Sequence, residues 1–319
     1  MENDAPFTEV IFNYYVNWVP FLLNLFSPVF VFISVIFFTS KMAQNSEIVA
    51  ILASGVSYRR LLRPYIITSV FLALVSFSLF AWIIPKADKV RVVFENEYIR
   101  DRTHYSASQI KTQISPGVIL SMGNFNFSDS AGFKVSIEEV KDGRLVSKLF
   151  AERLNWNKET QTWKLSKWWT REFIDGMEIL NRGSTLDTMI AFNPEDFFRK
   201  NDDVQMFNLK ELDEMIDLEQ MRGTGNTFFY TTERYKRFGM PFAVIILTII
   251  GVSVSSKKSR GGIGLNLGVG LLISFTFLIV FQFFLAYGSS GALHPLLAVS
   301  IPNLIFGGIA LIMYKLAQK

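Results

Sequence analysis

Residues that enzymes use for chemistry are scarce in this chain. It has no Cys and two His, His104 and His294, which lie far apart among unrelated neighbours. Disulfides and thiolate metal sites are therefore excluded, and a zinc enzyme or a Ser-His-Asp triad has little to build on. The chain also lacks the G-x-x-x-x-G-K-[ST] loop of many ATP-hydrolysing proteins. We predict that the protein is not an enzyme and that it binds no metal and no cofactor of its own.

Two other patterns have plain structural explanations. The acidic pairs Glu138-Glu139 and Asp202-Asp203 fall in polar stretches, which is typical of solvated surface. The glycines of Gly262-Ile263-Gly264 begin an apolar stretch, and Gly264 and Gly268 have the small-x-x-x-small spacing that lets membrane helices approach. Helix packing is therefore favoured over phosphate binding for these glycines.

The polar loop 41–63 carries the clearest signature. Asn45 or Ser46 is placed to cap a helix whose first turn holds Glu47, and Gly55 is placed to end it. Such a short helix at the membrane surface fits a contact with a cytoplasmic ATPase. It fits equally a capped interfacial turn in which the Glu47 carboxylate only interacts with the positive end of the helix dipole. Ser57 then begins a second helix, and the candidate contact residues are Glu47, Ile48, Ile51, Leu52, Arg59 and Arg60.

Five apolar stretches are long enough to cross a membrane, which takes about 20 residues. The long uncharged stretch 261–314 is divided in two by the turn Gly288-Ser289-Ser290-Gly291. An amphipathic segment, 4–18, precedes the first stretch and suits an interfacial helix. The predicted spans are Trp18–Phe38, Pro64–Pro85, Phe238–Ser256, 263–287 and 295–314.

The charges predict the orientation of these spans. The loops 41–63 and 257–260 and the C-terminal tail hold nine Lys and Arg residues against one acid, Glu47, which marks them as cytoplasmic. The long insert 86–237 falls on the other side, and its 23 basic and 24 acidic residues nearly balance. The net charge of +4 is therefore a mark of topology, and nucleic-acid binding loses its main support.

The insert changes from helical to strand periodicity. Its first part, 86–103, continues the second span as a polar helix, and alternating apolar residues then predict several strands without helices between them. Asn208 and Glu211 form a capping box for a later helix. The predicted fold class is a polytopic α-helical membrane protein with an inserted antiparallel β domain, jelly-roll-like. Its parts are 1–85 with two spans, the β domain 86–237 with flanking helices, and 238–319 with three spans.

One face of the predicted strands is apolar. This face could line a cleft for acyl chains, or it could be the filled core of a sandwich, because alternating apolar residues indicate burial before they indicate a ligand. Six bases near the outer membrane surface could guide an anionic lipid or serve as interfacial anchors: Lys86, Lys89, Arg91, Arg234, Lys236 and Arg237. The candidate lipid-binding residues are Val118, Leu120, Met122, Phe133, Val135, Ile137, Trp163, Leu165 and Trp169.

Four motifs resemble those of a known family. The segment N-S-E-I-V-A-I-L-A-S-G-V-S-Y-R-R-L-L, Asn45–Leu62, is similar to the loop between the second and third membrane helices of the lipopolysaccharide-export permeases of the LptF/LptG type. The R-x-x-x-P entry Arg237–Pro241, the turn Gly251–Gly262 and the I-P-N of Ile301–Asn303 are similar as well. The resemblance follows the order of nearly the whole chain.

This resemblance implies a function and a set of partners. Two such permease subunits bind a cytoplasmic ATPase dimer, which holds the ATP, in the bacterial inner membrane. They extract lipopolysaccharide and pass it through periplasmic jelly-roll domains to a bridge protein. By the same resemblance Glu47 matches the acidic residue of the helix that docks on the ATPase. Which of the two paralogues this chain is, and whether it pairs with itself, stays open.

The chain differs from the family pattern at its start. Family members have six spans, and the span that is missing here is the first, so the resemblance predicts a further helix before Met1 and a periplasmic N-terminus. Two alternatives remain. A lipoprotein-release permease usually has one span before its outer domain, whereas two precede it here. A scaffold without transport would need fewer than the three spans that follow the domain.

Overall fold

The computed structural model of the chain describes residues 5–99, 106–126, 129–174, 177–190, 201–223, 226–258 and 261–317. These residues form two units. The helical unit comprises Phe7–Arg91, Val204–Leu212 and Phe228–Lys319, and the β unit comprises Val92–Asp203 and Asp213–Thr227 together with Met1–Pro6.

The helical unit contains the predicted spans. In the part of the chain that is described, five helices are long and apolar enough to cross a membrane, as the sequence predicts. The helices are α1 (Phe7–Glu9), the π-helix η1 (Val10–Tyr15), α2 (Val16–Gln44), α3 (Glu47–Ala53), α4 (Tyr58–Ser78), the π-helix η2 (Leu79–Ile83), α5 (Ile84–Phe94), α7 (Thr227–Ser255), α8 (Gly262–Ser289) and α9 (Pro295–Ala317).

The first two of these membrane helices are much longer than a bilayer requires. The first runs for 38 residues from Phe7 to Gln44, and the second for 42 residues from Tyr58 through α5 and the π-helix η3 (Glu95–Ile99). Because about 20 residues cross the hydrocarbon, both helices continue beyond it. The predicted polar extension of the second span is confirmed as far as Ile99, and residues 100–103 lie outside the described part.

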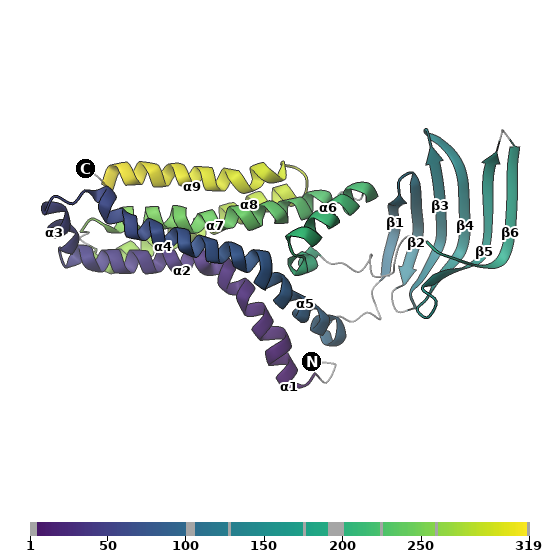
Figure 1. Cartoon of the computed structure of the whole chain (residues 1–319), viewed down its shortest axis with the longest axis horizontal. Helices are drawn as coiled ribbons and strands as arrows, with labels where there is room; N and C mark the ends of the chain where they lie inside the picture. The colour runs from purple at the N-terminus through teal and green to yellow at the C-terminus, as the bar shows by residue number, and fades with distance from the viewer. Residues whose placement is uncertain are drawn as a thin grey trace. The chain divides into compact units, whose positions relative to one another are not determined.

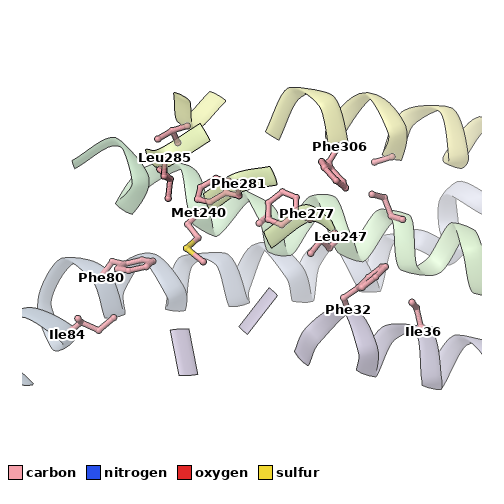
Figure 2. Close-up of a cluster of buried hydrophobic side chains, with 14 residues drawn as sticks. Phe32, Ile36, Phe80, Ile84, Met240, Leu247, Phe277, Phe281, Leu285 and Phe306 are labelled. Atoms are coloured by element: carbon pink, nitrogen blue, oxygen red, sulfur yellow. The ribbon is translucent and has the colours of Figure 1, made fainter. Parts of the chain in front are cut away.

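The core of the helical unit is mainly aromatic and aliphatic. Figure 2 shows Phe277 and Phe281 of α8 among Met240 and Leu247 of α7, with Phe306 of α9 beside them. The two α8 rings stack at 5.6 Å, and Phe306 meets Phe277 edge to face at 5.0 Å. This face of α8 repeats every three or four residues, as the helical period requires.

Glycine packing occurs at a different position of α8 from the one predicted. A Cβ atom at Gly264 or Gly268 would meet nothing within 4 Å, so these glycines face away from the other described helices. At Gly270 a Cβ atom would lie 2.2 Å from Cδ1 of Ile36, which brings α2 close to α8. The prediction is wrong by half a helical turn, because spacing alone does not say which face of α8 meets a neighbour.

The β unit is one antiparallel sheet with strands in sequence order (Figure 1). The inserted antiparallel β domain of the predicted fold class is confirmed, and the strand order is a meander. The first strand was not predicted, because it is polar apart from Ile110 and Ile114. The strands are β1 (Ser106–Ser115), β2 (Val118–Asn126), β3 (Ala131–Lys141), β4 (Arg144–Asn157), β5 (Thr162–Ile174) and β6 (Met177–Thr188).

A transverse crease runs across this sheet. In four neighbouring strands two successive residues face outward, which breaks the strict alternation of a flat strand. The row follows the register Asn124–Phe133–Arg153–Ser166 from β2 to β5. Gln109, Lys134 and Lys167, on alternate strands, have φ of 55°, 52° and 48° beside or within this row. The left-handed residues turn the strands, so the sheet bends over its own apolar face and encloses a core.

The crease decides which predicted residues share that core. Leu120, Met122 and Val135 on one side of it and Trp163 and Leu165 on β5 are fully buried together. On β3 and β5 the alternation shifts by one residue at the crease. The face predicted from constant alternation is therefore wrong for Phe133 and Trp169, which lie outside the core cluster.

We expect Lys134→Val to destabilise the β unit by about 1–2 kcal/mol, because a β-branched residue is strained at positive φ. Lys134→Gly removes the same side chain without that strain and should be neutral or slightly stabilising. Thermal unfolding of the full chain in detergent, followed by tryptophan fluorescence, measures both. Equal melting temperatures for the two variants would show that the left-handed backbone at Lys134 is not required.

Candidate functional site

The short helix α3 lies at the same end of the helical unit as the C-terminus (Figure 1). The ends of three other helices meet there: Tyr58 shares a hydrogen bond with Ser256 at 3.4 Å and packs its ring 5.9 Å from Tyr314. Lys257 donates to the carbonyl of Leu316. The basic loops predicted to be cytoplasmic are therefore held at one end of the unit.

The start of α3 differs from the predicted cap. Ser46 has a left-handed backbone (φ 61°), and no side chain accepts a hydrogen bond from the first turn. Instead the Asn45 amide donates to Oε1 of Glu47 at 3.0 Å. The prediction that Asn45 or Ser46 caps α3 is wrong, because the Asn45 side chain binds the Glu47 carboxylate instead of the backbone amides of the first turn. The predicted cap of the next helix is confirmed, since the Ser57 hydroxyl accepts from the amide of Arg60.

The residues predicted to contact an ATPase divide between two faces of α3 and α4. Glu47, Leu52, Arg59 and Arg60 are exposed, and Ile51 is half-buried. Ile48 is 2% exposed, so it holds α3 against the unit and offers no free surface. Val49, which is 60% exposed, completes the outward apolar face with Leu52 and was missed. A helical wheel identifies it, because residues three apart share a face.

A cavity of about 230 Å³ lies between α2, α7 and α8. Its walls are apolar except for Lys236 and Gln282, and the Lys236 ammonium donates to Glu233 at 3.0 Å. A mostly apolar cavity with a few polar groups suits an amphipathic molecule. The apolar lining residues are Leu25, Phe26, Met240, Leu278, Ile279, Phe281 and Leu285. Hydropathy did not reveal this cavity, since its residues are ordinary members of the predicted spans.

The bases predicted near the outer membrane surface are mostly engaged with carboxylates. Lys89 bonds to Glu211 at 2.5 Å, Arg91 to Asp88 at 2.7 Å, and Arg237 lies buried near Glu233. Arg234 lies over the ring of Tyr235, and Lys86 is exposed. Four of the six bases therefore pair with carboxylates: Lys89, Arg91, Lys236 and Arg237.

Five of the nine predicted lipid-binding residues are buried in the core of the β unit: Leu120, Met122, Val135, Trp163 and Leu165. Val118 and Ile137 are half-buried at its margin. Phe133 is 36% exposed and carries the Arg153 guanidinium 5.5 Å above its ring. Trp169 stacks on Phe150 at 5.6 Å. Trp168, missed by the sequence analysis, takes the inward position and packs against the core.

Two motifs that are distant in sequence meet in the helical unit. The Asn303 amide of the I-P-N segment donates to the carbonyl of Gly239, which lies inside the R-x-x-x-P segment, at 3.1 Å. A Cβ atom at Gly239 would lie 2.1 Å from Cγ1 of Val299, so α7 and α9 are in close contact there. The two motifs thus form one helix crossing.

A comparison with protein-family models agrees with these motifs. The model of the lipopolysaccharide export system permease LptF/LptG matches residues 2–316. The chain belongs to this family. A search of curated proteins finds no match. As a member of the LptF/LptG family, the chain is a multi-pass membrane protein of a transport-subunit family, with its β domain inserted between the second and third described spans.

Proposed function

We propose that this LptF/LptG-family chain is a permease subunit of an ABC transporter that extracts lipopolysaccharide from the inner membrane and passes it towards the outer membrane. The family match over residues 2–316 carries the proposal. The family name supplies the substrate, and five helices that can cross a membrane supply the permease architecture.

The charges support one orientation. The α3 end of the helical unit, which we assign to the cytoplasm, holds Lys41 in the last turn of α2, Arg59 and Arg60 in the first turn of α4, and Lys257 just after α7. The β unit, inserted between spans two and three, is then periplasmic. Long translocated domains are largely exempt from the charge rule, so the basic residues of α5 and α7 do not oppose this orientation.

The proposed partners follow from the same orientation. A cytoplasmic ATPase dimer binds and hydrolyses ATP, a second permease subunit completes the membrane part, and a periplasmic bridge protein with a jelly-roll fold receives the lipid. The outward face of α3, with Glu47, Val49 and Leu52, is the proposed contact with the ATPase. The described residues include no group of three or more His, Cys, Asp or Glu that could hold a metal.

For the lipid we propose a route along the β unit. The inward face of the sheet is filled by its own side chains, with Leu120 and Leu165 fully buried. Acyl chains can reach that face only if the two halves of the sheet part along the crease. Val118 and Ile137, at the half-buried margin, are the residues that a lipid would meet first.

A photo-crosslinking residue at Ile137 should therefore capture lipopolysaccharide in proteoliposomes that contain the ATPase and the second permease subunit, and only when ATP is hydrolysed. The same residue at Ser136, on the other side of the strand, is the matched control and should capture little. Capture of a lipoprotein instead would indicate the lipoprotein-release type of permease. If lipopolysaccharide is released while Ile137 captures none, the lipid does not touch this face, and if none is released, the proposed function is wrong.

A further inference from the structure

Arg237 of α7 is a buried cation with fixed partners. It is 1% exposed. Its Nη1 donates to the carbonyl of Phe207 at 2.6 Å and its Nη2 to the carbonyl of Val204 at 3.1 Å. Nε lies 3.6 Å from Oε1 of Glu233, one helical turn earlier. A buried charge is stable only when it is paired and hydrogen-bonded, so these partners hold the guanidinium in one place.

The two carbonyls belong to the segment that precedes α6 (Leu209–Arg222). Val204 lies in the 3₁₀-helix η5 (Asn201–Met206), and Phe207 follows it. The Val204 carbonyl also accepts a hydrogen bond from the Phe207 amide at 3.3 Å, and a cation is favourable beside the carbonyl end of such a turn. The Phe207 ring also meets the ring of Tyr230 of α7, at 6.4 Å. Arg237 therefore fixes the chain to α7 just before α6 begins.

The start of α6 is in turn fixed to α5. The backbone amide of Asn208 donates to Oε2 of Glu211, and the amide of Glu211 donates to the Asn208 side chain, which confirms the predicted capping box. Oε1 of Glu211 binds Lys89 of α5. Partial burial is the largest influence on Glu211 and raises its pKa, but hydrogen bonds from Lys89 and Asn208 lower the pKa below its usual 4.5.

These contacts involve two of the covalent connections between the helical unit and the β unit. The chain leaves the helical unit after Arg91 of α5 and re-enters it as Val204–Leu212, which holds the end of η5 and the start of α6. Lys89 belongs to the outgoing connection and Val204, Phe207 and Glu211 to the returning one. We infer that Arg237 is a positioning residue that latches these two connections to α7, so that a displacement of α7 in the transport cycle moves them together. This inference rests on the proposed function.

This arrangement favours an arginine over a lysine. Its planar fork reaches two carbonyls at once, whereas the lysine ammonium is a point charge that reaches them less well. Arg237→Gln should therefore open the latch, Arg237→Lys should have an intermediate effect, and Arg234→Gln, on the same helix, is the matched control. The Cys-free chain lets the latch be observed directly, because a Val204→Cys thiol is buried as long as the segment stays on α7.

The first measurement does not depend on transport. A maleimide should label V204C at least about tenfold faster when Arg237→Gln is also present. Without the guanidinium, the Glu233 carboxylate loses its buried partner, which strongly weakens the packing of the segment on α7. Arg234→Gln, which removes a half-buried cation from the same helix, should leave the labelling rate within about twofold. Equal rates with Arg237 and with the Gln variant would overturn the latch, whatever the protein transports.

The second measurement tests the role in transport. With the ATPase and the second permease subunit, Arg237→Gln should hydrolyse ATP near the normal rate but release about tenfold less lipopolysaccharide, and Arg237→Lys should fall between. In the pair V204C and R237C, a flexible bifunctional thiol reagent should restore release by replacing the latch covalently. If the bridged pair stays inactive, or if Arg237→Gln releases lipid normally, the latch does not couple α7 to transport. A wild-type complex that releases no lipopolysaccharide would instead refute the proposed function.

Discussion

The Glu47→Lys variant should accumulate in the membrane and fold, yet lose ATP-driven lipid release. Glu47 is exposed, and its partner within the described residues is the exposed amide of Asn45, so folding loses little. As a first-turn carboxylate it stabilises α3 by only about 0.3–1 kcal/mol. Reversing a charge that faces a basic partner across an interface costs about 2–5 kcal/mol or more. That cost lowers ATPase affinity by roughly 30-fold to several thousandfold.

Co-purification of the ATPase and lipid release from proteoliposomes measure this effect. Glu47→Gln is the matched control: it removes the charge, keeps a hydrogen-bond acceptor for Asn45, and should be affected less than the Lys variant. Val49→Ala, on the exposed face of the same helix, tests whether the apolar part of α3 contributes. Normal lipid release by Glu47→Lys would mean that Glu47 only stabilises the first turn of α3 and does not contact the ATPase.

Trp163→Ala should destabilise the β unit severely. Trp163 is fully buried, 4.9 Å from the ring of Trp156 and 6.3 Å from that of Phe125. Removing a buried aromatic ring costs about 3–5 kcal/mol, a large part of the stability of a small domain. Trp169→Ala, six residues along the same strand, removes the same ring from the outward face and should cost about 1–2 kcal/mol through its contacts with Phe150 and Arg171.

This pair of variants tests the crease, because constant alternation would place both rings in one core. Denaturant unfolding of the full chain and protease resistance of the β unit should both distinguish them. A similar loss from the two variants would mean that Trp163 and Trp169 share a face and that the sheet is not bent between them.

Local patterns in the sequence predicted the elements of this protein. The five membrane helices follow from uncharged stretches longer than a bilayer, because a charge or an unpaired backbone group in hydrocarbon is costly wherever it occurs. Strands β2 to β5 follow from alternation over a few residues, and the capping box of Asn208 and Glu211 from a spacing of three. The motif Asn45–Leu62 led to the family, and the family match agrees with it.

Only the tertiary structure decided how those elements meet. The face of the sheet on which Trp169 lies depends on Lys167, which has a left-handed backbone conformation. This conformation is accommodated because the neighbouring strands bend at the same row. Gly270, rather than Gly264, faces α2 because the buried side of a helix is set by its neighbours. Arg237 looked like an interfacial base, yet it binds carbonyls 30 and 33 residues away. Each outcome rests on contacts between distant segments, and a local pattern contains no information about those partners.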